Sequence, residues 1–289
     1  MNAGRNENQH FIAMLKIFNL IIVFSGILYC QLIAYDWVEA LPEPWTLSAV
    51  EISDLLIDFQ DQYPQFDDRL KAFTLWRVGT PYGDFMLGEE KEPDTDPIIR
   101  LDVSDCTVHV LTTLAFTQSK SWEEAQHSME KINYKNDSTG SPAVDFSKRW
   151  HFTLDRIHSN PYTTNITESY VNKNQLIPLE ITLNRKSEGS EFLALGWVKS
   201  IKTKYISRDL VDSDLLSRLP KVVGIAFVKK SFFKLGIAIG HEGILLDQTK
   251  FVHASLDSNR TVNVDFLDYF KEGSGTTFDG ILIYKFNQF

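Results

Sequence analysis

The spacing of apolar residues divides the chain into two kinds of pattern. Up to about residue 132, apolar side chains recur every three or four positions, which is typical of amphipathic helices. The predicted helices span Trp45–Trp76 with a break at Pro64, Cys106–Gln118 and Trp122–Ile132. From Leu176 onward the period changes to two, which predicts β-strands. These strands are Val222–Val228, Leu235–Leu246, Lys250–Leu256, Thr261–Phe266 and Gly280–Phe286. We therefore expect an α+β fold, with helices first and an antiparallel sheet after them.

An uncharged apolar run near the N-terminus indicates a targeting segment. Phe18–Ala34 runs 17 residues without a charge, behind a weakly basic start. That length suits the hydrophobic region of a signal peptide and is short for a transmembrane helix. We expect residues 1–34 to be a cleaved signal peptide, a lipid anchor attached through Cys30, or an uncleaved membrane anchor. Residues 35–289 then form a single exported domain, periplasmic or in the cell envelope, which meets a membrane only through this segment.

Composition narrows the classes of partner and cofactor. The chain has 29 basic and 38 acidic residues, a formal net charge of -9, which disfavours binding to a nucleic-acid backbone. We therefore expect no nucleic-acid partner. Two cysteines are too few for a disulfide framework or a four-cysteine zinc site. After loss of residues 1–34 the exported chain keeps one thiol, Cys106, which makes a reactive role worth testing.

Cys106 follows Asp105 at the predicted start of a helix. The unpaired backbone N–H groups and the helix dipole at that end favour an anion, so we expect a thiol pKa below the value of about 8.5 for free cysteine. The alternative is an inert buried cysteine. His109 lies on the same predicted helix, and we expect it to be a surface or half-buried residue rather than a second base.

Two histidines fall on neighbouring predicted strands. A hairpin centred on Asp247 would place His241 opposite His253 on one sheet face, with Cβ atoms about 5 Å apart. A base and an orienting partner presented to a thiolate are the parts of a cysteine acyl-transfer site, with His241 next to sulfur and His253 holding its ring. The alternative is a metal site, for which Cys106 could supply a third ligand.

Five short motifs together resemble the DUF1460 family, whose members are N-acetylmuramoyl-L-alanine amidase-like and belong to the NlpC/P60 class of papain-like cell-wall hydrolases. The motifs are Gly79-Thr80-Pro81-Tyr82, Asp105-Cys106-Thr107, Arg149-Trp150-His151-Phe152, His241-Glu242-Gly243-Ile244 and His253-Ala254-Ser255. The resemblance runs from about residue 50 to 286. It implies a papain-like fold in which N-terminal helices pack on a C-terminal antiparallel sheet or half-barrel.

The resemblance also implies roles for single residues. Cys106, His241 and His253 take the positions of nucleophile, base and orienting residue. Four further residues are implied at the substrate: Tyr82 and Asp105 beside the thiol, and Arg149 and His151 lining the cleft. No metal or other cofactor is implied.

The resulting hypothesis is an exported cysteine amidase or endopeptidase that hydrolyses an amide bond in peptidoglycan stem peptides or muropeptides. The bond could be the N-acetylmuramoyl-L-alanine amide or the γ-D-glutamyl-diamino acid bond. Two departures from the family pattern support an alternative, a cell-wall-binding module with weak or no turnover. Glu242 stands where the family usually has Val, and an acidic residue usual after the cysteine is missing.

Overall fold

A computed structural model describes residues 37–289 of the protein. The predicted targeting segment, residues 1–34, lies outside the described residues. None of the helices within residues 37–289 has the length and apolar character needed to cross a membrane. Pro42–Phe289 form one compact unit, distinct from Met1–Leu41, and the description below concerns that unit.

Six α-helices carry the first half of the unit and one later connection. They are α2 (Ala49–Gln62), α3 (Phe66–Trp76), α4 (Cys106–Thr117), α5 (Trp122–Asn133), α6 (Thr153–Ser159) and α7 (Ser213–Ser217). The break predicted at Pro64 is confirmed, since α2 ends at Gln62 and α3 begins at Phe66. Ser48 and Glu51 form a reciprocal capping box that starts α2. The predicted start of the first helix at Trp45 is wrong, because a 3-10 turn, Pro44–Thr46, precedes α2.

Eight strands form one antiparallel sheet. They are β1 (Thr163–Asn165), β2 (Ile177–Leu183), β3 (Lys199–Ser207), β4 (Val222–Val228), β5 (Ile239–Leu246), β6 (Lys250–Ser255), β7 (Arg260–Asp265) and β8 (Gly280–Phe286). Their order is β2-β3-β8-β4-β5-β6-β7, and β1 pairs with β8. The strand predicted from Leu235 begins at Ile239, because a 3-10 segment runs to Leu235 and Gly236 turns the chain with φ of 75°. The prediction of helices followed by an antiparallel sheet is confirmed.

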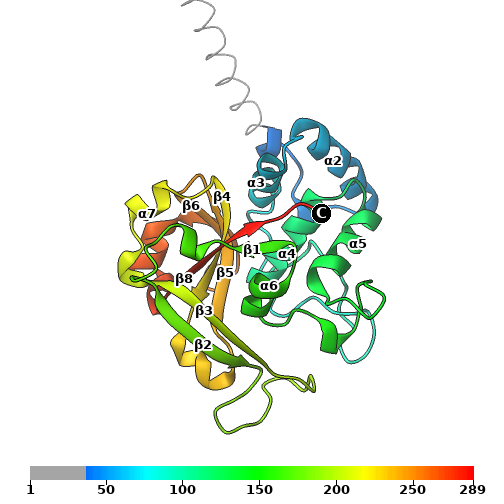
Figure 1. The fold of residues 1–289 in the computed structure, drawn as a ribbon. Coiled ribbons are helices and arrows are strands. Elements are labelled where there is room, and N and C mark those ends of the chain that lie inside the picture. The colour runs from blue at the N-terminus through cyan, green and yellow to red at the C-terminus, as the bar shows by residue number, and fades with distance from the viewer. Residues whose placement is uncertain (1–36) are drawn as a thin grey trace, which may run out of the picture. The chain divides into compact units, whose positions relative to one another are not determined.

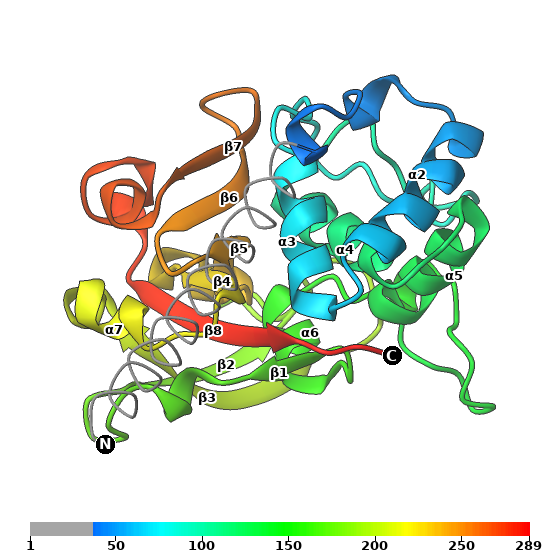
Figure 2. The same ribbon diagram turned by 90° about the horizontal axis from the view of Figure 1, so that it is seen from above.

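The core explains why the helices and the sheet stay together. Strand β4 is buried along its whole length. Phe227 on β4 and Phe251 on β6 belong to one buried aromatic cluster with Phe266 and Phe270, which follow β7. Helix α4 is buried from Val108 to Thr117 and packs against β5 and β6 as well as against α3 and α5. Figures 1 and 2 show α2, α3, α4 and α5 grouped beside the sheet. The start of α4 is thereby held against the two strands that carry the histidines.

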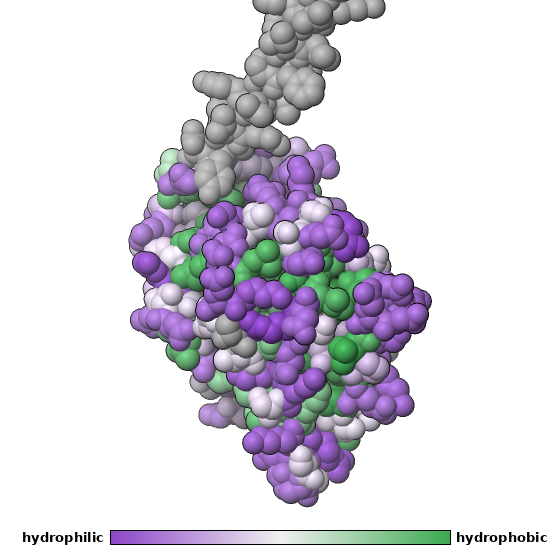
Figure 3. All heavy atoms as spheres, turned by 90° about the vertical axis from the view of Figure 1, so that its left-hand side faces the viewer, coloured by the Kyte–Doolittle hydropathy of each residue, from purple (hydrophilic) through white to green (hydrophobic). Residues whose placement is uncertain are grey.

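The surface seen from one side carries polar and apolar groups together. The face in Figure 3 is mainly hydrophilic, with hydrophobic groups scattered between the polar ones. Exposed large apolar side chains include Phe85 and Leu256, which are 81% and 69% exposed. Phe85 is close in sequence to Tyr82 and Leu256 to His253, two residues of the candidate site.

Candidate active site

Cys106 is the first residue of α4, as predicted from the sequence. Asp105 is the N-cap, and its carboxylate accepts hydrogen bonds from the backbone N–H groups of Val108 at 2.7 Å and Phe85 at 3.0 Å. The second bond ties the loop before the helix to the helix start. Phe85 adopts φ of 55°, a left-handed conformation that an aromatic residue seldom takes. Cys106 itself is a free, half-buried thiol.

The two predicted histidines do meet, although the predicted hairpin register is wrong. Leu246 pairs with Lys250 and Ile244 with Val252, so the hairpin is centred on Gln248 rather than on Asp247. Continuing that register makes His241 and His253 diagonal rather than direct neighbours. The change preserves the period-two alternation, so both rings stay on one face. His241 Nε2 lies 2.9 Å from His253 Nδ1, with the ring planes 85° apart.

Cys106 lies next to the β5 segment that carries His241. The backbone N–H of Glu242 lies near enough to the Cys106 sulfur to lower the pKa of the thiol. Within residues 37–289 no direct hydrogen bond joins this sulfur to the His241 ring. Catalytic hydrogen bonds are often long without substrate and shorten in the reacting complex. The lack of a hydrogen bond here is therefore compatible with Cys106 as nucleophile and His241 as its base.

The expected depression of the thiol pKa is wrong for this resting structure. Burial raises the pKa of the Cys106 thiol, and the charges of Asp105 and Glu242 raise it further. The Glu242 N–H and Thr107 act in the opposite direction but do not reverse the shift. Burial and the neighbouring His253 hold the pKa of His241 well below its ordinary value. At neutral pH the pair is therefore a neutral thiol beside a neutral imidazole.

Two tyrosines lie near enough to Cys106 for their charges to interact. Tyr82, predicted from the sequence, forms a parallel bridge with Ser104, and its N–H donates to the carbonyl of Asn259 at 3.1 Å. Tyr269 was missed, because nothing in its sequence neighbourhood marks it. Its ring centroid lies 4.6 Å from that of His253. Burial raises the pKa of both tyrosines, and a thiolate at Cys106 raises it further.

His109 differs from the expectation of a surface or half-buried residue. It is fully buried, and neither ring nitrogen has a hydrogen-bond partner among the residues described. Burial lowers its pKa, helped by the charge of Arg77 and by the two site histidines. Because α4 packs against the sheet on this side, the side chain of His109 is buried, although the sequence predicted that it would be at least partly exposed.

Arg149 and His151 lie in a different set of contacts. The guanidinium of Arg149 bonds to Glu89 Oε1 at 2.7 Å, Asp94 Oδ2 at 2.9 Å and the carbonyl of Leu87 at 2.8 Å. His151 Nε2 lies 2.5 Å from the carbonyl oxygen of Phe146, and burial lowers the His151 pKa to about 4. In the described part of the chain no hydrogen bond, ion pair or ring contact joins either residue to the cysteine or the two histidines.

Glu242 is the second residue that sequence reasoning did not place in the site. Its side chain is fully buried. The carboxylate accepts hydrogen bonds from Tyr284 at 2.7 Å, Thr107 at 3.2 Å and Thr153 at 3.1 Å, and it pairs with Arg156. The signal was a single acidic residue inside an apolar strand, which a buried strand accepts only when the charge is paired.

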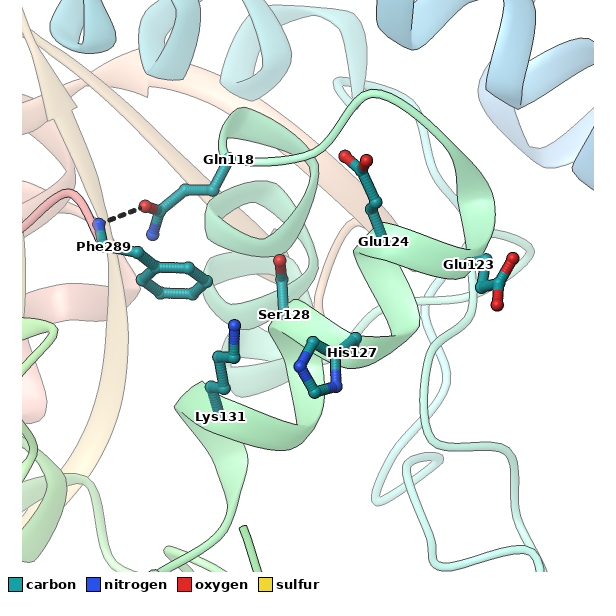
Figure 4. A pocket seen from close by; sticks show the side chains of 7 residues that line it. All are labelled: Gln118, Glu123, Glu124, His127, Ser128, Lys131 and Phe289. Atoms are coloured by element: carbon teal, nitrogen blue, oxygen red, sulfur yellow. Dashed lines mark hydrogen bonds between the residues drawn. The ribbon is translucent and has the colours of Figure 1, made fainter. Parts of the chain in front are cut away.

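Other concave or ligand-like features lie apart from these residues. A surface cavity of about 350 Å³ is formed by the end of α4, by α5 and by Phe289, whose N–H donates to Gln118 (Figure 4). None of the predicted site residues lines it. Within residues 37–289, no group of three or more His, Cys, Asp or Glu side chains is arranged to hold a metal ion.

Comparisons with known proteins identify a family and a shared fold. The profile of the AmiA-like family, described as N-acetylmuramoyl-L-alanine amidase-like, matches residues 72–276. A DUF1460 protein from Legionella pneumophila is similar in structure with a TM-score of 0.66 and 19% identity, covering 82% of this chain and 94% of that one. An N-acetylmuramoyl-L-alanine amidase from Bacteroides uniformis gives a TM-score of 0.59 and 19% identity, covering 78% of this chain and 100% of that one.

At these identities the structural likeness establishes a shared fold, while the family profile spans most of the chain. A comparison with curated proteins gave no match. The motifs around Tyr82, Cys106, Arg149, His241 and His253 all fall inside the matched region. The chain therefore belongs to the N-acetylmuramoyl-L-alanine amidase-like family, DUF1460, as its motifs indicated.

Proposed function

We propose that the protein is an exported cysteine amidase or endopeptidase that hydrolyses an amide bond in peptidoglycan stem peptides. One observation carries this proposal: a half-buried cysteine at a helix start lies beside the strand of a hydrogen-bonded His241–His253 pair. Family membership supplies the amidase-like chemistry and the peptidoglycan-type substrate. The papain-like NlpC/P60 relationship and the Cys-His-His triad are parts of the same proposal.

The neutral state of the pair sets the order of proton transfers. In the productive tautomer His241 Nε2–H donates to His253 Nδ1, which leaves His241 Nδ1 free to take the thiol proton. Sulfur then bonds to the amide carbon, and the carbonyl electrons move to the oxygen. Backbone N–H groups at the start of α4 stabilise this oxyanion. The imidazolium of His241 returns the proton to the leaving amine, and water hydrolyses the thioester.

The anionic substrate needs a cation, and the protein carries a net charge of -9. Arg149 was the sequence candidate, but its guanidinium already bonds to the 87–94 loop. We therefore propose that Arg149 and His151 shape the cleft wall, with Tyr82 and Asp105 beside the thiol. Arg260 is a second cation that the sequence did not suggest.

Two observations support a position of Arg260 near the proposed reacting groups. It pairs with Ser255 across β6 and β7, so alternation puts its side chain on the His253 face. Its backbone also bridges Pro81, next to Tyr82. Its side chain is exposed and, within residues 37–289, enters no ion pair. A guanidinium in this position can bind a stem-peptide carboxylate bidentately.

The compartment and the domain boundaries follow from the proposed substrate. Peptidoglycan lies outside the cytoplasm, so the proposal assigns residues 1–34 to export or anchoring and residues 35–289 to a single catalytic domain. Contact with a membrane is assigned to the N-terminal segment alone. N-terminal sequencing of the protein from its native envelope tests this point, and a cytoplasmic product beginning at Met1 would contradict it.

The decisive experiment is digestion of purified sacculi by the wild type and by Cys106→Ala, with the products identified by mass spectrometry. We expect new amino termini or freed stem peptides from the wild type and none from the variant. Equal products from both would overturn cysteine catalysis. The mass of the product identifies the bond that is cut.

A second candidate function is cell-wall binding without turnover. The raised pKa of the Cys106 thiol favours it, because a protonated thiol is a poor nucleophile. Co-sedimentation with sacculi, run beside the digestion, separates the two functions. Binding by both proteins with no product from the wild type would support the binding module.

A further inference from the structure

Glu242 connects three elements that are distant in sequence. Its carboxylate is fully buried and accepts from Thr107 on α4, from Thr153 on α6 and from the Tyr284 hydroxyl on β8. Arg156 on α6 supplies the compensating charge. Both carboxylate oxygens therefore have donors, as a charge in the interior requires.

The same residue touches the candidate site in three ways. Its side chain holds Thr107, which directly follows Cys106. Its backbone N–H lies near the Cys106 sulfur and lowers the pKa of the thiol. Its peptide bond joins it to His241, whose ring points to the opposite sheet face because strand side chains alternate. Any displacement of Glu242 therefore moves the thiol and the imidazole relative to each other.

We propose that Glu242 is a positioning residue of the active site, whose buried carboxylate fixes the Cys106 end of α4 against the β5 segment that carries His241. Arg156, Thr153 and Tyr284 hold the carboxylate in place from α6 and β8. The network acts through other residues and does not touch the reacting bond. Its effect on turnover depends on the proposed function, whereas its effect on the thiol does not.

The charge of Glu242 has a second consequence for the thiol. The ionisable groups that interact with Cys106 are the carboxylates of Asp105 and Glu242 and the phenols of Tyr82 and Tyr269, and His241 lies on β5, which packs against α4. Within this set the two carboxylates oppose formation of the thiolate. Burial is the largest cause of the raised thiol pKa, and the charge of Glu242 adds to the effects of burial and Asp105, so reaction requires proton removal by His241 during attack.

The test measures the rate of iodoacetamide alkylation against pH in the full chain. Glu242→Gln removes the charge and keeps the shape and one acceptor oxygen. We expect the apparent pKa of the thiol to fall by about 1 unit or more, the size typical for loss of a close charge. Glu89→Gln is the matched control, because Glu89 is also a fully buried carboxylate paired with an arginine, Arg149. The control should leave the midpoint unchanged.

Thr107→Val and Tyr284→Phe keep the proposal testable if Glu242→Gln fails to fold. Each removes one hydrogen bond to the carboxylate and leaves the charge, so neither should lower the alkylation midpoint. Both should lower kcat on sacculi with little change in KM, since positioning is lost while the substrate surface is intact.

Two results would overturn the proposal. One is an alkylation midpoint in Glu242→Gln that matches the wild type or falls equally in Glu89→Gln. The other is unchanged kcat in both Thr107→Val and Tyr284→Phe. Alkylation needs no substrate, so a midpoint shift in a protein that fails to digest sacculi would overturn the proposed function and leave the positioning role standing.

Discussion

Arg149 shows how contacts decide a role at the scale of one residue. Its guanidinium pairs with Glu89, whose side chain is fully buried, and with Asp94. Arg149→Ala would leave a buried charge unpaired, so we expect a loss of about 3–5 kcal/mol in the free energy of unfolding. Urea unfolding measures this loss, and activity per folded molecule should change little. Wild-type stability with lost activity would instead support direct substrate binding by Arg149.

Arg260 should behave in the opposite way. Its side chain is exposed and unpaired within the described residues, so Arg260→Ala should change stability by less than about 0.5 kcal/mol. The KM for a stem peptide with a free carboxylate should rise about tenfold, the loss of one charged hydrogen-bonded contact. An amidated peptide should show no such change. Lys250→Ala is the control, since Lys250 is exposed at the other end of the same hairpin.

At the scale of elements, the approach of β4 to β8 determines where Tyr284 can lie. Gly224 pairs with Tyr284, and a Cβ added at Gly224 would lie 2.1 Å from the tyrosine ring. Gly224→Ala must therefore displace the ring, and with it the hydrogen bond to Glu242. We expect a loss of about 1–3 kcal/mol or more in stability, as for other overpacked cores.

A double-mutant cycle checks this explanation. Tyr284→Ala makes room for the added methyl group, so the double variant should be more stable than the sum of the single losses predicts. Additive losses would show that Gly224→Ala acts through the backbone of β4 rather than through the tyrosine ring.

At the scale of the whole molecule, buried histidines link stability to pH. Burial lowers the pKa of His253 from 6.5 to about 4, and that of His151 to about 4. Between these values and 6.5 the unfolded chain binds more protons than the folded one, so stability rises with pH. The stabilisation that these neutral histidines give should be fully present above about pH 6.5 and should decrease as the pH falls toward 4. His253, which is 3% exposed, contributes on the order of 3 kcal/mol to this change.

Chemical denaturation at several pH values between 4 and 7 measures this dependence. His253→Asn should reduce the slope, because the variant no longer takes up a proton there on unfolding. A stability that is flat from pH 7 to 4 would contradict the burial of neutral histidines.

The sequence by itself determined the features that depend on near neighbours along the chain. The α+β order followed from the change of hydrophobic period, and the start of α4 followed from Asp105 as its N-cap. The prediction that His241 and His253 meet was right although the predicted register was wrong. The sheet face on which a side chain lies depends only on the alternation along its strand. The family motifs were also readable without a structure.

Only the tertiary structure decided the environment of those residues. Glu242 bonds to Thr107, Arg156 and Tyr284, which are 135, 86 and 42 residues away. The burial of His109 and the pairing of Arg149 with the 87–94 loop also depend on residues that are distant in the sequence. Sequence reasoning gave Cys106 a lowered pKa from its helix start alone, whereas the folded chain surrounds it with two carboxylates and removes water. Charge interactions and desolvation depend on distance in space, which periodicity along the chain does not specify.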